Sequence, residues 1–174
     1  MKYEIPGVKD KVCVITGGAG VIGTSLGLGL AEAGAKVAIV DFNLERANEV
    51  ANLINAKTNS GAIGVFANVL DKNLLIESRN QIHSKLGKID VLINNAGIQH
   101  VSPIEDFPDD KWNAIIGINL TSAFYLSKAV WPGMKERKFG RIINIASAHG
   151  LVASEFKSAY VASKHGIVGF TKTL

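Results

Sequence analysis

The chain has 174 residues, of which 47% are hydrophobic and 20% charged, and its mean hydropathy is +0.20. These values predict one soluble globular domain over residues 1–174, because the chain is long enough for one substantial core and too short for two. A net charge of +4 without a purely basic cluster argues against nucleic-acid binding. One cysteine and no apolar run of about 20 residues argue against internal disulfides and a membrane span, which favours a cytoplasmic protein.

The first half of the chain alternates short apolar runs with helical periodicities. The apolar runs are typical of buried strands and cover residues 11–16, 36–41 and 62–67. After the first run, apolar residues recur at helical spacing from Ile22 until Gly34, which is a natural helix stop. The second run is followed by a helix with apolar positions from Leu44 to Ile54, and a third helix is predicted over residues 71–86.

The second half continues the alternation. Strands are predicted over residues 89–93 and 141–146, and a last helix starts at about residue 158. Between these strands runs a long helical pattern over residues 109–137, with a break or bend expected near Pro132 because proline lacks the amide hydrogen. Apolar strands separated by helices predict a doubly wound α/β domain, with about five parallel strands and helices on both faces.

A glycine-rich turn joins the first strand to the first helix. Its sequence, Gly18-Ala-Gly20-Val-Ile-Gly23, lets the backbone approach a pyrophosphate at the positive end of the helix. Asp41 ends the second strand about 20 residues later, where a carboxylate can bind ribose hydroxyls and repels a 2′-phosphate. Together they predict NAD rather than NADP, although an aspartate can also end a strand simply as a turn former.

Tyr160 and Lys164 are spaced as neighbours on one face of the last helix. An ammonium in that position favours the phenolate, which lets a tyrosine act as acid or base near neutral pH. Ser147, at the end of the fifth apolar run, could supply a hydroxyl that holds a substrate oxygen. Taken alone, the same spacing also fits an ordinary solvated pair on an amphipathic helix.

Five motifs in this order make the sequence resemble the short-chain dehydrogenase/reductase family. They are the glycine turn, Asn94-Asn-Ala-Gly97, Asn119, Ser147 and Tyr160-x-x-x-Lys164. The resemblance covers the chain from Lys11 onward. It implies a Rossmann-like domain and an oxidoreductase that transfers hydride between NAD and an alcohol or carbonyl. It also implies a catalytic tetrad, formed by Asn119, Ser147, Tyr160 and Lys164.

The same resemblance implies a set of cofactor contacts. Asn68 stands where the family often has an aspartate against adenine, a mild departure. Val21 replaces a glycine of the usual pattern and Gly20 comes one position early, so we expect a somewhat unusual phosphate loop. The expected cofactor-binding residues are Gly17, Gly18, Gly20, Val21, Ile22, Gly23, Asp41, Phe42, Asn68, Val69, Asn95, Ala96, Gly97, Tyr160 and Lys164.

The substrate side looks like that of the bacterial D-3-hydroxybutyrate dehydrogenases. In that group, residues matching Gln99, His149 and Lys157 surround a small carboxylate beside the residues matching Ser147 and Tyr160. An amide, an imidazole and an ammonium suit such an anion. The alternative is that His149 and Lys157 are ordinary surface residues. The glycine turn looks equally like that of sugar-acid oxidoreductases acting on fructuronate or mannonate.

Two further expectations concern partners and completeness. The histidines show no metal-ligand spacing, so no metal is predicted, and a homo-oligomer, dimer or tetramer, is expected. Members of the resembling family are longer, so we expect a truncated chain that lacks the family's last strands and its substrate loop. Such a chain could alternatively be a nucleotide-binding fragment without activity.

Overall fold

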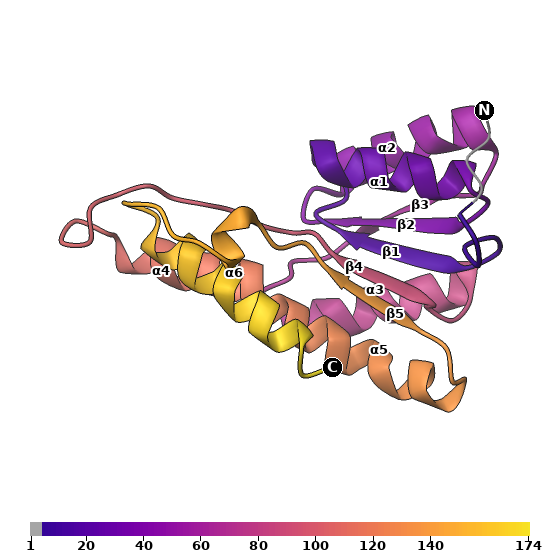
Figure 1. Cartoon of the computed structure of the whole chain (residues 1–174). Coiled ribbons are helices and arrows are strands. Elements are labelled where there is room, and N and C mark those ends of the chain that lie inside the picture. The colour runs from indigo at the N-terminus through magenta and orange to yellow at the C-terminus, as the bar shows by residue number, and fades with distance from the viewer. Residues whose placement is uncertain (1–4) are drawn as a thin grey trace.

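The sheet of this protein is parallel and carries helices on both faces, as Figure 1 shows. The structure, a computed structural model, describes residues 5–174, so the first four residues of the predicted domain lie outside the described residues. Within the described part, five strands pair in the order β3-β2-β1-β4-β5, which confirms the doubly wound α/β fold. The strands are β1 (Val12–Thr16), β2 (Lys36–Asp41), β3 (Ile63–Phe66), β4 (Val91–Asn94) and β5 (Arg141–Asn144).

The helices match the predicted segments closely, with one exception. They are α1 (Val21–Glu32), α2 (Leu44–Thr58), α3 (Lys72–Leu86), α4 (Asp109–Ile116), α5 (Ser122–Glu136) and α6 (Ser158–Thr171). The helix predicted over residues 109–137 is divided into α4 and α5 by a π-helical turn, Gly117–Thr121. The break expected near Pro132 is wrong, because α5 continues through this residue. Proline has no amide hydrogen, so the Lys128 carbonyl loses its helical hydrogen-bond donor. Pro132 and Lys128 are both exposed, so water can hydrate that carbonyl.

Two apolar cores hold the layers together. On one face of the sheet, Ile39 of β2 packs with Ile54 of α2, and on the other, Leu92 of β4 packs with Leu126 of α5. Figure 1 shows α1 and α2 on the first face and α3 and α5 on the second. The single cysteine of the sequence, Cys13, lies in the central strand with 0% exposure. Burial, reinforced by Asp90, raises its pKa to about 12.

The helices after β1 and β2 begin at the same edge of the sheet. Asn43 caps α2, because its side-chain oxygen accepts a hydrogen bond of 3.0 Å from the Arg46 amide. Gly20 precedes α1, and no side chain within residues 5–174 caps this helix. The first amides of α1 therefore remain available to an anion at the positive end of the helix.

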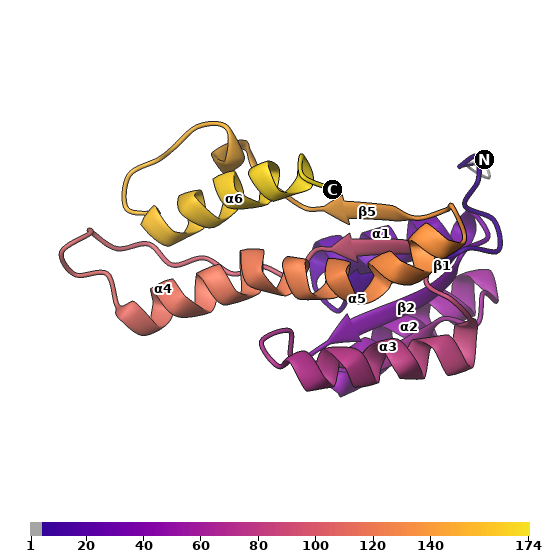
Figure 2. The same ribbon diagram turned by 90° about the horizontal axis from the view of Figure 1, so that it is seen from below.

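Beyond the carboxyl ends of β4 and β5, α4 and α6 lie side by side (Figures 1 and 2). Gly166 lets α6 approach the π-helical turn, since a Cβ there would lie 2.8 Å from the Leu120 side chain. Of the expected tetrad, Asn119 lies in the π-helical turn, Ser147 in the loop after β5, and Tyr160 and Lys164 on α6. Within residues 5–174, no helix combines the length and apolar character that a bilayer span requires.

Candidate active site

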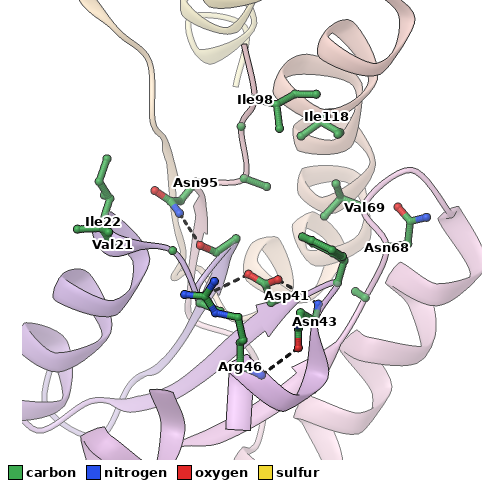
Figure 3. Close-up of a pocket in the computed structure, with 17 residues that line it drawn as sticks. Val21, Ile22, Asp41, Asn43, Arg46, Asn68, Val69, Asn95, Ile98 and Ile118 are labelled. Carbon is green, nitrogen blue, oxygen red and sulfur yellow. Dashed lines mark hydrogen bonds between the residues drawn. The ribbon is translucent and has the colours of Figure 1, made fainter. Parts of the chain in front are cut away.

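A cavity of about 750 Å³ opens at the carboxyl ends of β1, β2 and β4 (Figure 3). Ligands of open α/β sheets bind at this edge, next to helix N-termini. The structure brings most of the expected cofactor residues together here. Those lining the cavity are Gly17, Gly20, Val21, Ile22, Asp41, Phe42, Asn68, Val69, Asn95, Ala96 and Gly97.

The other two glycines of the turn, Gly18 and Gly23, are not among the lining residues, and close backbone packing requires them. A Cβ on Gly18 would lie 2.9 Å from the Ile15 carbonyl oxygen, and one on Gly23 would lie 2.6 Å from the Gly18 Cα. Gly17 has a φ of +59° and would press a Cβ against Ala96 at 2.9 Å. These three glycines are therefore needed for the turn itself.

Gly20 differs, because it faces open space. A Cβ there would meet only the Gly17 carbonyl oxygen, at 3.4 Å, so protein packing does not forbid a side chain. The bare backbone instead leaves room in the cavity beside the uncapped start of α1. This cradle fits a phosphate group, which a helix N-terminus binds through its free amides. Val21, the departure from the usual pattern, points its side chain outward and is 87% exposed.

Asp41 is held rigidly at the end of β2. One carboxylate oxygen accepts a hydrogen bond from the Ala19 amide and the other accepts one from the Asn43 amide, each at 3.1 Å. The side chain thus ties the glycine turn to the start of α2 while lining the cavity. A carboxylate fixed in this way keeps acceptor capacity for ligand hydroxyls, since each oxygen has two lone pairs.

Several residues that line the cavity were missed in the sequence. Arg46 lies in the first turn of α2, and Figure 3 shows it reaching the same part of the cavity as Asp41. The position of Arg46, three residues after the helix-capping Asn43, could have indicated that it reaches the cavity. Ile98 and Ile118 close the opposite side, but no local sequence pattern distinguishes them from core residues. The remaining missed residues are Ala19, Asn43 and Ala67.

Asn95 and Thr16 lock β4 to β1 below the cavity. The Asn95 side-chain amide donates to the Thr16 and Gly17 carbonyls, both at 3.0 Å. In return, the Thr16 hydroxyl accepts from the Asn95 and Ala96 amides at 3.1 and 3.2 Å. Asn95 therefore uses its amide donors to fix the floor of the cavity, and Thr16 is a supporting residue that the sequence did not indicate.

Tyr160 and Lys164 lie on α6 as the spacing predicted. The Lys164 ammonium lies 5.6 Å from the centre of the Tyr160 ring and donates a hydrogen bond of 2.6 Å to the Ile145 carbonyl. Lys164 is only 5% exposed, and this burial lowers its pKa. The arrangement places a buried ammonium over the ring of a half-buried tyrosine.

His149 faces the same tyrosine, and Ser147 lies two residues before it. Ser147 caps the short 3-10 helix Ala148–Gly150, because its hydroxyl accepts a hydrogen bond from the His149 amide at 3.2 Å. The His149 ring stands perpendicular to the Tyr160 ring with centroids 6.1 Å apart. Its Nδ1 is buried and has no hydrogen-bond partner within residues 5–174. A buried nitrogen without a partner is costly, so this atom fits a polar group of a ligand.

Gln99 and Lys157 lie on two loops that meet. Gln99 is exposed in the loop after β4, and half-buried Lys157 immediately precedes α6. The Ser102 amide donates to the Phe156 carbonyl at 2.9 Å, which joins these loops close to both residues. The structure thus brings the two loops together, without fixing either side chain on a partner among the described residues.

Asn119 is buried in the π-helical turn, and its side-chain amide makes hydrogen bonds to other residues of the protein. The side-chain oxygen accepts from the Ile98 amide, and the nitrogen donates to the Ile98 carbonyl, both at 2.9 Å. The nitrogen also donates to the Ser163 hydroxyl at 3.2 Å. Asn119 therefore clamps the cavity wall at Ile98 to α6.

Comparisons with known proteins agree with this geometry. A family model described as short chain dehydrogenase matches residues 11–174. The chain is 47% identical over 167 residues to D-beta-hydroxybutyrate dehydrogenase of Cupriavidus necator, a match that covers 95% of the chain and 64% of the relative. It is 36% identical over 162 residues to 5-keto-D-gluconate 5-reductase of Escherichia coli, covering 93% and 63%.

A solved structure gives the same result for the fold. The crystal structure of NAD⁺-bound xylitol dehydrogenase superposes with a TM-score of 0.91 at 33% identity, over 96% of this chain and 64% of that one. The chain thus spans less than two thirds of the length of these relatives.

Proposed function

Because the chain belongs to the short-chain dehydrogenase family, we propose that it carries out hydride transfer between NAD and a small hydroxy or keto acid. We propose further that residues 1–174 form one cofactor-binding domain. The observation that carries the proposal is the buried Lys164 ammonium beside Tyr160, on a helix joined through Asn119 to the cavity wall. A tyrosine beside an ammonium can transfer a proton while the cofactor accepts or donates hydride.

NAD is the cofactor that this cavity suits. Gly20 and the start of α1 would hold the pyrophosphate, and Asp41 would bind the adenosine ribose. Asn68 and Val69, which also line the cavity, would contact the adenine. When bound, the nicotinamide supplies the hydride acceptor or donor. The cavity holds one carboxylate and one guanidinium at the ribose side, and we propose that the more buried Asp41 determines the choice of NAD.

The proton chemistry falls to three side chains and one backbone segment. Ser147 and Tyr160 would bind the substrate oxygen, and Tyr160 would take its proton during oxidation and return it during reduction. Lys164 would place its ammonium beside the Tyr160 ring. Because the Asn119 side chain is already committed, we propose that the backbone of its π-helical turn, rather than its amide, holds any water of a proton path.

A small carboxylate is the substrate we propose, with (R)-3-hydroxybutyrate and acetoacetate as the best candidates. His149 offers a buried nitrogen without a partner beside Tyr160, and Gln99 and Lys157 lie on the two joined loops. An ammonium and an imidazole can both make strong hydrogen bonds to a carboxylate. The similarity to two D-beta-hydroxybutyrate dehydrogenases, at 47% and 42% identity, supports this choice.

A sugar acid is the second candidate. The similarity to a 5-keto-D-gluconate 5-reductase supports it, since that relative matches nearly the same part of the chain at 36% identity. Both candidates carry a carboxylate, so His149 and Lys157 serve either one. The two differ in size and in the number of hydroxyl groups that need partners.

A substrate panel tests the proposal. The chain is incubated with NAD and either (R)-3-hydroxybutyrate, its S enantiomer or mannonate, the hydroxy acid whose oxidation gives fructuronate, and NADH is followed by absorbance. We expect turnover of the R enantiomer and little of the S enantiomer. Preference for mannonate would select the second candidate. NADH binding without turnover of any substrate would instead identify a nucleotide-binding chain without activity, the alternative expected from the sequence.

A further inference from the structure

We propose that Ser163 is a positioning residue that joins the Tyr160–Lys164 turn of α6 to the wall of the cofactor cavity. Ser163 has 0% exposure and lies directly before Lys164. It does not line the cavity, and neither the sequence motifs nor the comparisons single it out. The inference rests on the proposed function, because Tyr160 and Lys164 need exact placement only if they act on a bound cofactor and substrate.

The contacts of Ser163 form an unbroken chain between the two sides of the site. Its hydroxyl donates to the Tyr160 carbonyl at 2.8 Å and accepts from the Asn119 side-chain nitrogen at 3.2 Å. Asn119 in turn holds both the amide and the carbonyl of Ile98 at 2.9 Å. Ile98 lines the cofactor cavity. The proton-transfer side and the cofactor side are therefore joined by four hydrogen bonds through two buried side chains.

The position of α6 depends on such links, because this helix lies beyond the strand ends rather than flat on the sheet (Figure 2). Two other polar ties are Lys164 to the Ile145 carbonyl and Thr171 to Asn144. The Ser163 link is the one that reaches the cavity wall. A misplacement of reacting groups by about 1 Å can cost a factor of about 100 in rate, so a small shift of α6 would be visible in turnover.

Replacing Ser163 by alanine removes one oxygen, and alanine has a high helix propensity, so the fold should persist. It leaves one buried N–H of Asn119 without its acceptor. The matched control is Ser127→Ala in α5, because Ser127 is also buried, at 2%, and its hydroxyl has no partner within residues 5–174. Both variants lose the same atom, but only the first breaks the link.

The test compares wild type, Ser163→Ala and Ser127→Ala by turnover of NAD with 3-hydroxybutyrate and by NADH affinity. We expect kcat to fall about tenfold in Ser163→Ala while the Kd for NADH changes less than about twofold, with both values unchanged in Ser127→Ala. Equal kcat in the two variants would overturn the inference. A lower melting temperature of Ser163→Ala with unchanged kcat would overturn it too, because that is a purely structural effect.

Hydrogen exchange at the Ile98 amide tests the same link without requiring activity. This amide donates to Asn119, so we expect it to exchange several-fold faster in Ser163→Ala than in Ser127→Ala. Equal exchange would contradict the inference. If wild type itself shows no turnover on any substrate, the proposed activity fails, and the exchange measurement still decides whether Ser163 holds the cavity wall.

Discussion

At the scale of single residues, the opposing charges of Asp41 and Arg46 offer the sharpest test of cofactor choice. Both line the same part of the cavity, and Asp41 is fixed by two backbone amides while Arg46 is exposed (Figure 3). A fixed carboxylate at 8% exposure repels a 2′-phosphate more strongly than an exposed guanidinium attracts it.

We therefore expect Asp41→Asn to raise the affinity for NADPH relative to NADH by about tenfold, which is a typical effect of one nearby charge. Arg46→Gln should lower NADPH affinity and leave NADH affinity nearly unchanged. Glu45→Gln, an exposed charge change in the same helix turn, is the control. Fluorescence titrations with both reduced cofactors measure these effects. An unchanged NADPH to NADH ratio in Asp41→Asn would contradict the role of Asp41.

Lys164 gives a second residue-scale prediction, through pH. Its burial lowers the pKa in the folded protein, whereas the unfolded chain keeps the ordinary value near 10.4. Between those two values the unfolded chain holds a proton that the folded chain has lost, so stability rises with pH there. Below the folded value, the full penalty of the buried charge remains.

A neutral residue at this position removes that dependence. We expect the free energy of unfolding of wild type, relative to Lys164→Met, to increase from neutral pH to about pH 10. Urea unfolding at several pH values measures the difference, and Lys172→Met, on an exposed residue after α6, serves as control. A constant difference between wild type and Lys164→Met across this range would show that the ammonium is not buried as described.

At the scale of elements, Arg137 ties the end of α5 to the sheet. Its guanidinium donates to the Ile89 carbonyl at 2.7 Å and approaches Asp90 at 3.5 Å. Asp90 also accepts from the Val12 amide at 3.1 Å, so one cluster joins α5, the start of β4 and the start of β1. Both charged side chains are largely buried, which makes this pair stronger than an ordinary surface ion pair.

Truncating Arg137 should therefore cost stability without touching the site. We expect Arg137→Ala to lower the free energy of unfolding by about 1–2 kcal/mol, and Lys135→Ala, an exposed neighbour, to change it by less than about 0.5 kcal/mol. NADH affinity should be unchanged in both variants. Equal stability of the two variants in urea unfolding would contradict the role assigned to Arg137.

The elements themselves were predictable because apolar periodicity and helix caps are local properties. Asp71 illustrates this: its carboxylate caps α3, where the sequence placed a helix start. The π-helical turn was not predictable, because it depends on contacts of Asn119 with Ile98 and Ser163, which are distant in sequence. The expected break at Pro132 was wrong because its effect on the helix depends on exposure to water, which the local sequence does not show.

The site shows the same division. Gly20 and Asp41 stand in a pattern with a known mechanism, so their place at the cavity could be predicted. Arg46 and Ile98 reach the cavity through the way that α2 and the loop after β4 pack. The role of Ser163 could not be predicted from a sequence motif, because its hydroxyl acts through a hydrogen bond to Asn119, which is distant in sequence. Residues that act through other residues are those that sequence patterns miss.

At the scale of the whole molecule, the chain joins two functional halves. The sheet with α1 and α2 provides the cavity, and the π-helical turn and α6 carry Asn119, Tyr160 and Lys164, to which we assign the proton transfer. The chain spans about 64% of the length of its relatives, and it contains every member of the tetrad that the resemblance implies. We therefore attribute both cofactor binding and proton transfer to these residues.

The most direct test of this account replaces Tyr160 by phenylalanine and measures NAD reduction with (R)-3-hydroxybutyrate. The change removes the phenol oxygen and leaves the ring that stands perpendicular to that of His149. We predict a fall in kcat by a factor of about 100 or more with NADH affinity retained, while Tyr125→Phe in α5 keeps both values. Turnover by Tyr160→Phe at nearly the wild-type rate would contradict the central claim, because another group would then have to move the proton.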